Sequence, residues 1–89
     1  MELTLFVLRG CPHCRRALKF MEELCREEPR YQQVKVRQID EGEQPALADQ
    51  YDYYYVPCYF LEREKLHEGS CTKEQIRAVL DRALAAQNG

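Results

Sequence analysis

A change of hydrophobic spacing at residues 10 to 12 constrains the fold of this chain more than any other feature. Leu3 to Leu8 is a short apolar run that ends at Gly10, and it predicts a buried strand. After Pro12 the apolar side chains recur every three or four residues, which predicts an amphipathic helix ending before Pro29. A strand followed directly by a helix indicates a chain of alternating strands and helices.

The rest of the chain continues this alternation. Thr72 followed by Gln75 is a capping-box pattern that predicts the start of a final helix. The expected order is β-α-β-α-β-β-α, an α/β fold with a four-stranded mixed sheet and helices on both faces. We expect the first three strands to be parallel and the last two to form a hairpin. The other expected elements are a strand at 34–39, a short helix at 43–51 with Pro45 in its first turn, and strands at 56–61 and 65–68.

Size and composition predict one soluble domain over residues 1–89. The net charge of -2 gives no support for nucleic acid or an anionic membrane as a partner. No apolar run approaches the roughly 20 residues that span a bilayer. The first residues also lack the charge and cleavage pattern of a signal peptide. We therefore expect a cytoplasmic monomer.

The five cysteines cannot all pair within one chain, and a disulfide framework is not expected in the cytoplasm. Cys11 and Cys14 are the only close pair. Closing a loop of about four residues would contribute only about 2 kcal/mol to stability, against about 3 kcal/mol for fifteen residues. The spacing therefore favours redox chemistry over a structural crosslink.

The position of Cys11 at the start of the predicted helix favours its thiolate, the form that attacks disulfides. Unsatisfied N–H groups and the helix dipole stabilise an anion at this position. Arg9, Arg15, Arg16 and Lys19 add positive charge, and no carboxylate occurs between Leu3 and Met21. An alternative is that these cations simply form a solvated helix face. We assign Cys11 as the nucleophile.

Cys14 lies one turn later, on the predicted buried stripe, and should be the less exposed thiol with the higher pKa. We assign it as the resolving cysteine. Helical side chains at this spacing have Cβ atoms about 5–6 Å apart, whereas a disulfide requires roughly 3.5–4.5 Å, so the bond should be easily reduced. We expect Pro12, His13 and Arg9 to tune the pair.

Cys11-Pro12-His13-Cys14 after a first strand, Val56-Pro57 about 45 residues later and Gly69 before the last helix resemble the small redoxins, thioredoxin and glutaredoxin. The resemblance covers essentially the whole chain. It implies a thiol–disulfide oxidoreductase in which Pro57 is cis and the backbone of Val56 docks the substrate. It implies disulfide-containing proteins as substrates, and a reductase or glutathione as electron donor.

The sequence has features of both branches. Chain length, the Cys-Pro-x-Cys motif and Leu5 in place of a buried aspartate are similar to glutaredoxin. The segments 48–57 and 69–73 are similar to thioredoxin. Ser70 and Lys73 depart from the glutaredoxin pattern that holds glutathione, although Arg9 and Thr72 could still contact it. We expect no tightly bound cofactor, with glutathione as an alternative co-substrate.

The remaining candidates each have a plainer interpretation. Cys58 directly follows Pro57, which would place it near the active pair, but a buried strand cysteine is the more common case. Cys25 should pack in the core, and Cys71 should be partly exposed without a role. Tyr54 or Tyr55 could line the docking groove. His67 is expected to be hydrogen-bonded or on the surface.

Two other functions remain open. A metal site could use Cys11, Cys14 and Cys58 with His67 or Cys71, although tetrahedral zinc needs four ligands, and two chains could share a metal or an iron–sulfur cluster. The fold could also serve as a redox-inactive binding module, although such a module would have no need of both active-site cysteines.

Overall fold

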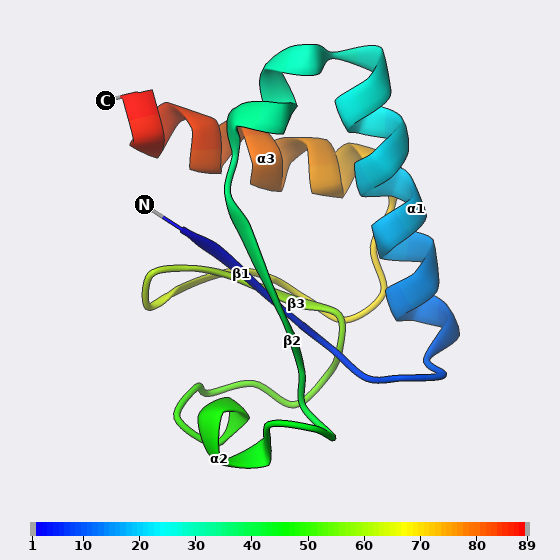
Figure 1. Cartoon of the computed structure of the whole chain (residues 1–89), viewed down its shortest axis with the longest axis vertical. Helices are drawn as coiled ribbons and strands as arrows, with labels where there is room; N and C mark the ends of the chain where they lie inside the picture. Colours follow the sequence, from blue (N-terminus) through cyan, green and yellow to red (C-terminus); the bar gives the residue numbers. More distant parts are fainter. Residues whose placement is uncertain (1, 89) are drawn as a thin grey trace.

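The computed structural model describes residues 2–88, and its elements alternate between strand and helix as expected (Figure 1). The short helix is the one that differs most from the prediction, because four residues form it instead of nine. The elements are β1 (Leu3–Val7), α1 (Pro12–Glu27), the 3₁₀ helix η1 (Pro29–Gln33), β2 (Val36–Asp40), α2 (Pro45–Ala48), β3 (Cys58–Leu61), β4 (Glu64–Glu68) and α3 (Lys73–Asn88).

The four strands form one mixed sheet in the order β2-β1-β3-β4. β1 and β2 are parallel, and β3 and β4 form the expected antiparallel hairpin. The central strand β1 is fully buried along its length, so the apolar run that opens the sequence lies in the middle of the sheet.

The direction predicted for the third strand is wrong, because β3 is antiparallel to β1. A parallel strand would require the chain to travel back along the whole sheet after β2. The four residues of α2 provide only about 6 Å of helix, so residues 41–57 stay at the end of the sheet where β2 finishes. Cys58 then pairs with Phe6, near the end of β1, and β3 runs back from there.

Helices cover both faces of the sheet, as predicted. α1 and α3 lie on one side of the strands and α2 on the other (Figure 1). Leu5 of β1 and Leu24 of α1 belong to the larger core on the α1–α3 face. Phe6, which follows Leu5 in the strand, points to the opposite face and packs in a smaller core with Ala48 of α2.

The helix ends follow local rules. Pro12 occupies the first turn of α1, and the backbone N–H of Glu28 closes its last turn by donating to the Leu24 carbonyl at 2.8 Å. The predicted capping box is confirmed at the start of α3. The N–H of Gln75 donates to the Thr72 hydroxyl at 3.1 Å, and the Gln75 side chain accepts from the Thr72 N–H at 2.9 Å.

None of the helices within residues 2–88 is both long and apolar enough to cross a membrane.

Candidate active site

Cys11 lies where the chain leaves β1 and enters α1. Gly10 has a φ of 85°, a conformation that a residue without a Cβ adopts readily. The N–H of Cys11 donates to the Leu8 carbonyl at 3.1 Å and closes this turn. Cys11 is the N-cap residue of α1 and is half-buried. The predicted position at the mouth of the helix is therefore correct.

The surroundings of Cys11 stabilise its thiolate. Partial burial acts to raise the pKa of Cys11, but hydrogen bonds from the Cys14 N–H, the Cys14 thiol and the His13 N–H outweigh it. The charge of Arg15 acts in the same direction, and the pKa of Cys11 is lowered overall. His13 contributes to this lowering through its backbone N–H.

Cys14 has the opposite environment. Its side chain is 3% exposed, and burial raises the pKa of its thiol to about 12. The Leu8 amide opposes this rise, while the hydrogen bond to Cys11 and the charges of Cys11 and Glu41 add to it. Both thiols are free, one turn apart. The predicted difference in exposure and pKa between them is thus present.

A cavity of about 480 Å³ opens beside both thiols. Arg9, Arg15 and Leu18 line it on the side of Cys11, and Asp40 and Glu43 lie on the wall formed by the end of β2. Arg9 and Arg15 therefore line the same cavity as Cys11 and Cys14.

Pro57 lies at the same end of the sheet as Cys11, just before the Cys58–Phe6 pair. The Val56–Pro57 peptide bond is cis, as the resemblance implied. Val56 is half-buried and contacts both cores. Gly69, with a φ of 86°, donates its N–H to the Pro57 carbonyl at 2.8 Å. β4 is therefore tied directly to the proline.

Tyr54 and Tyr55, which precede Val56, are strongly exposed, at 84% and 70%. The Glu68 carboxylate accepts hydrogen bonds from the backbone N–H groups of both tyrosines and from the Lys65 side chain. These donors, Lys65 first, lower the pKa of Glu68 to about 2. Glu68 thus fixes the segment before Pro57. This role was not predicted, because nothing in the sequence pairs a strand carboxylate with amides thirteen and fourteen residues earlier.

The expectation that Cys58 lies close to the active pair is wrong. Residues of β3 alternate between faces, and Cys58 packs in the smaller core while Cys14 packs in the larger one. Cys58 is fully buried, and burial raises the pKa of its thiol to about 12. The plainer interpretation, a small buried side chain, is the correct one.

Cys71 also differs from expectation, because it is 6% exposed and belongs to the larger core. Burial raises the pKa of its thiol. Cys25 packs against the same core as predicted, and burial raises its pKa too. His67 is hydrogen-bonded as predicted, with its Nε2 3.0 Å from the Ser70 carbonyl oxygen.

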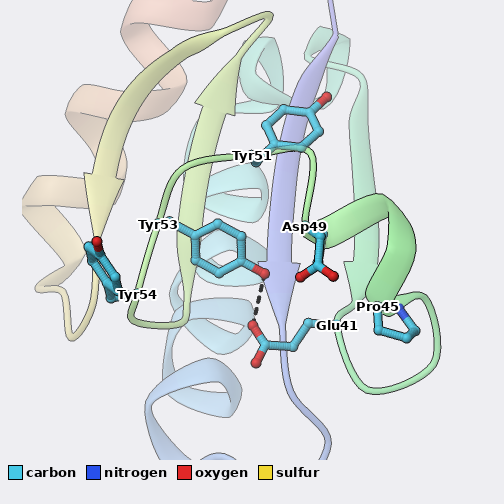
Figure 2. A pocket seen from close by; sticks show the side chains of 7 residues that line it. Glu41, Pro45, Asp49, Tyr51, Tyr53 and Tyr54 are labelled. Carbon is cyan, nitrogen blue, oxygen red and sulfur yellow. Dashed lines mark hydrogen bonds between the residues drawn. The ribbon is translucent and has the colours of Figure 1, made fainter.

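The tyrosines near Pro57 divide between the two faces. Tyr59 is fully buried in the larger core, whereas Tyr51 and Tyr53 pack against Phe6 on the opposite face. Tyr53 lines a pocket of about 430 Å³, and its hydroxyl donates to Glu41 at 2.8 Å (Figure 2). The charge of Glu41 also contributes to the raised pKa of Cys14.

The metal hypothesis loses its proposed ligand set, because Cys58 and Cys14 lie on opposite faces of the sheet. Within residues 2–88, His, Cys, Asp and Glu side chains form no cluster of three or more that could hold a metal ion. Thr72 keeps its predicted place before α3, where its hydroxyl serves the helix cap.

Solved structures of thioredoxins superpose on this chain over most of its length. Thioredoxin 1 of Thermosipho africanus is 16% identical, with a TM-score of 0.67 and complete coverage of both chains. Oxidised thioredoxin of Plasmodium falciparum is 13% identical, with a TM-score of 0.69 and coverage of 91% of this chain and 78% of its own. Thioredoxin of Fasciola hepatica is 19% identical, with a TM-score of 0.66 and coverage of 92% and 79%.

No model of a protein family matches the sequence, and a comparison with curated proteins finds no significant match. The likeness is therefore one of architecture, supported by several structures at similar scores. This chain has a thioredoxin-like fold.

Proposed function

We propose that this chain is a thiol–disulfide oxidoreductase that reduces disulfides through Cys11 and Cys14. The observation that carries the proposal is the contrast between the two thiols. The pKa of Cys11 is lowered at the exposed mouth of α1, while burial raises that of Cys14 to about 12. The half-buried thiol is thus the one prepared to attack, and its neighbour is protected from solvent.

The reaction balances as a two-electron exchange. The Cys11 thiolate attacks one sulfur of the substrate disulfide, which forms a mixed disulfide and releases the other sulfur as a thiolate that takes up a proton. The Cys14 thiol then loses its proton and attacks the Cys11 sulfur. This step releases the second substrate thiol and leaves a Cys11–Cys14 disulfide. An external dithiol, or two molecules of glutathione, then returns two electrons to the pair and restores the Cys11 thiolate and the Cys14 thiol.

The surroundings of Cys14 suit this second step. In the free protein, Cys14 donates its hydrogen bond to the Cys11 thiolate. Once Cys11 is bonded to substrate, the negative charge that raised the pKa of Cys14 disappears. The Leu8 amide, which favours the thiolate, remains in place. Cys14 therefore becomes easier to deprotonate when its attack is required.

We further propose disulfide-bearing proteins as substrates and Val56 and Pro57 as the docking backbone beside Tyr55. The electron donor is a reductase or glutathione, with Arg9, Gly69 and Thr72 as the residues that would contact glutathione. The strongly exposed Tyr54 and Tyr55 support the docking role, because they directly precede the half-buried Val56 at the same end of the sheet as Cys11.

The decisive experiment traps the mixed disulfide. Cys14→Ser should accumulate a covalent adduct with a disulfide peptide, detectable by intact mass, whereas Cys11→Ser should form none. The Cys58→Ser variant is the matched control and should turn over normally. Full disulfide reduction by Cys11→Ser would refute the mechanism.

A second measurement follows thiolate absorbance against pH in the reduced protein. One thiol should ionise well below the ordinary cysteine pKa, and that transition should vanish in Cys11→Ser. An ordinary pKa for Cys11 would contradict the proposal.

A further inference from the structure

Four exposed cations lie within eight residues of Cys11 along the chain, just after β1 and in α1. We call Arg9, Arg15, Arg16 and Lys19 the basic rim. Among the described residues, every ion pair involves other cations. The cations that do pair are Arg26, Arg30, Lys65, Lys73, Arg77 and Arg82.

The basic rim extends along α1 and to both sides of Cys11. The Arg15 N–H donates to the Cys11 carbonyl at 3.1 Å, so Arg15 and then Lys19 follow Cys11 on one face of the helix. Arg9 and Arg15 line the cavity that holds both active thiols. Arg16 is exposed on the same helix.

This concentration of positive charge stands out because the chain as a whole carries a net charge of -2. Unpaired cations beside a reactive group attract anionic partners and raise their rate of association. Two carboxylates also line the cavity, Asp40 and Glu43. Asp40 is held in place by three backbone N–H groups, one of them from Arg9, whereas Glu43 is exposed.

We propose that the substrate disulfide lies in an acidic protein segment, whose carboxylates contact the basic rim along α1. This inference rests on the proposed function and adds its substrate class. Lys19 is eight residues beyond Cys11, about 12 Å along the helix. An extended chain covers that length in about four residues, so the acidic side chains should fall within about four residues of the target cysteine. Glutathione has one residue on each side of its cysteine and does not extend that far.

The test compares three synthetic peptides that share one disulfide and differ only in flanking residues, which are aspartate, asparagine or lysine. Stopped-flow mixing with the reduced protein gives a second-order rate constant for each. At low salt the acidic peptide should react about tenfold faster than the neutral one. Added salt should remove this advantage because it screens the charges. The lysine peptide should show the opposite dependence on salt.

The double variant Arg16→Glu/Lys19→Glu should lose the preference for the acidic peptide over the neutral one, measured as the ratio of the two rate constants in the same protein. These two side chains are chosen because Arg15 also acts on the pKa of Cys11. The matched control Lys35→Glu/Arg37→Glu makes the same change of charge at exposed positions of β2 and its approach, outside the cavity. The control should retain the preference. Glu43→Gln should increase it.

The outcomes separate the two proposals. If the wild-type protein reduces all three peptides equally at every salt concentration, the acidic substrate is refuted and the oxidoreductase stands. If the rim variant and the control variant reduce the preference for the acidic peptide equally, the basic rim is not the specific binding surface and the proposal is refuted. If the protein reduces none of the peptides, the proposed function itself fails. The salt dependence of the wild-type protein decides the matter even if the double variant does not fold. Glutathione disulfide serves as a fourth substrate, and it should lose less rate than the acidic peptide in the variant Arg16→Glu/Lys19→Glu. An equal loss of rate for glutathione disulfide and the acidic peptide would overturn the assignment to a protein segment.

Discussion

At the scale of single residues, the two thiols of the candidate site are chemically identical but lie in opposite environments. Cys11 receives hydrogen bonds from backbone and thiol donors of the first helical turn, and Cys14 is removed from water by the core. The motif allowed this difference to be predicted, because the helix start and the apolar stripe are both visible in the sequence. The source of the stabilisation was only partly predictable, since backbone N–H directions depend on the folded turn.

A prediction for His13 follows from its backbone donor. His13→Pro removes the N–H that lowers the pKa of Cys11, while proline remains tolerated in the first turn of a helix. The pKa of Cys11 should rise by about one unit, and the redox potential should become more negative by about 30 mV. Equilibration with a glutathione buffer measures the potential. His13→Ala keeps the N–H and should change the potential less, so equal shifts in the two variants would argue against the backbone role.

At the scale of elements, the cap of α3 is both predictable and testable. Thr72 and Gln75 satisfy each other's backbone N–H groups. Thr72→Ala should lower the free energy of unfolding by about 1 kcal/mol, as measured by urea denaturation. Ser70→Ala, an exposed position two residues earlier, is the control and should have little effect. A Thr72→Ala protein as stable as the wild type would show that the cap contributes nothing.

The second prediction at this scale concerns the segment that β4 holds. Glu68→Gln weakens the hydrogen bonds to the amides of Tyr54 and Tyr55 and should lower the free energy of unfolding at pH 7 by about 1 to 2 kcal/mol. Glu64→Gln on the same strand removes only an exposed pair with Arg82 and should cost less than about 0.5 kcal/mol.

The pH dependence provides a further check on Glu68. Its folded pKa of about 2 lies below the ordinary value of 4.5. The stability that it contributes is therefore present above pH 4.5 and is lost as the pH falls toward 2. Glu68→Gln should show a shallower loss of stability over this range than the wild type. If the two proteins lost stability identically between pH 4.5 and 2, the charge of Glu68 would not contribute to the stability of the fold.

The direction of β3 shows where sequence reasoning reaches its limit. The apolar residues at 58–61 identified a buried strand but not the end from which the chain enters it. That direction depended on the length of α2, and residues 49–57 form an aromatic loop rather than helix. The same limit explains Cys58, because its face depends on the register of β3 with β1. Hydrophobic pattern predicts burial, whereas direction and register follow from how connections fit around the sheet.

At the scale of the whole molecule, buried thiols on both faces of the sheet couple stability to alkaline pH. The pKa values of Cys14 and Cys58 are raised from 9.0 to about 12. Both thiols stay protonated in the fold but ionise in the unfolded chain above pH 9. Stability should therefore be complete below pH 9 and should fall as the pH rises toward 12, by about 1.4 kcal/mol per pH unit for each thiol.

Denaturation of the reduced protein at several alkaline pH values measures this loss. Cys58→Val keeps an apolar side chain in the smaller core and removes one of the two thiols. Its stability should decline less steeply than that of the wild type over the same range. If the free energy of unfolding fell with pH equally steeply in both proteins, Cys58 would not ionise on unfolding.

The sheet that separates Cys58 from Cys14, together with the core that encloses Cys71, has a consequence for chemical reactivity. Four of the five cysteine thiols have a raised pKa, and three of those four are buried. Toward an electrophile at neutral pH, Cys11 should therefore react faster than the other four cysteines of the folded protein. Oxidants and alkylating agents should modify this thiol first and reach Cys14, Cys58 and Cys71 mainly after the fold opens.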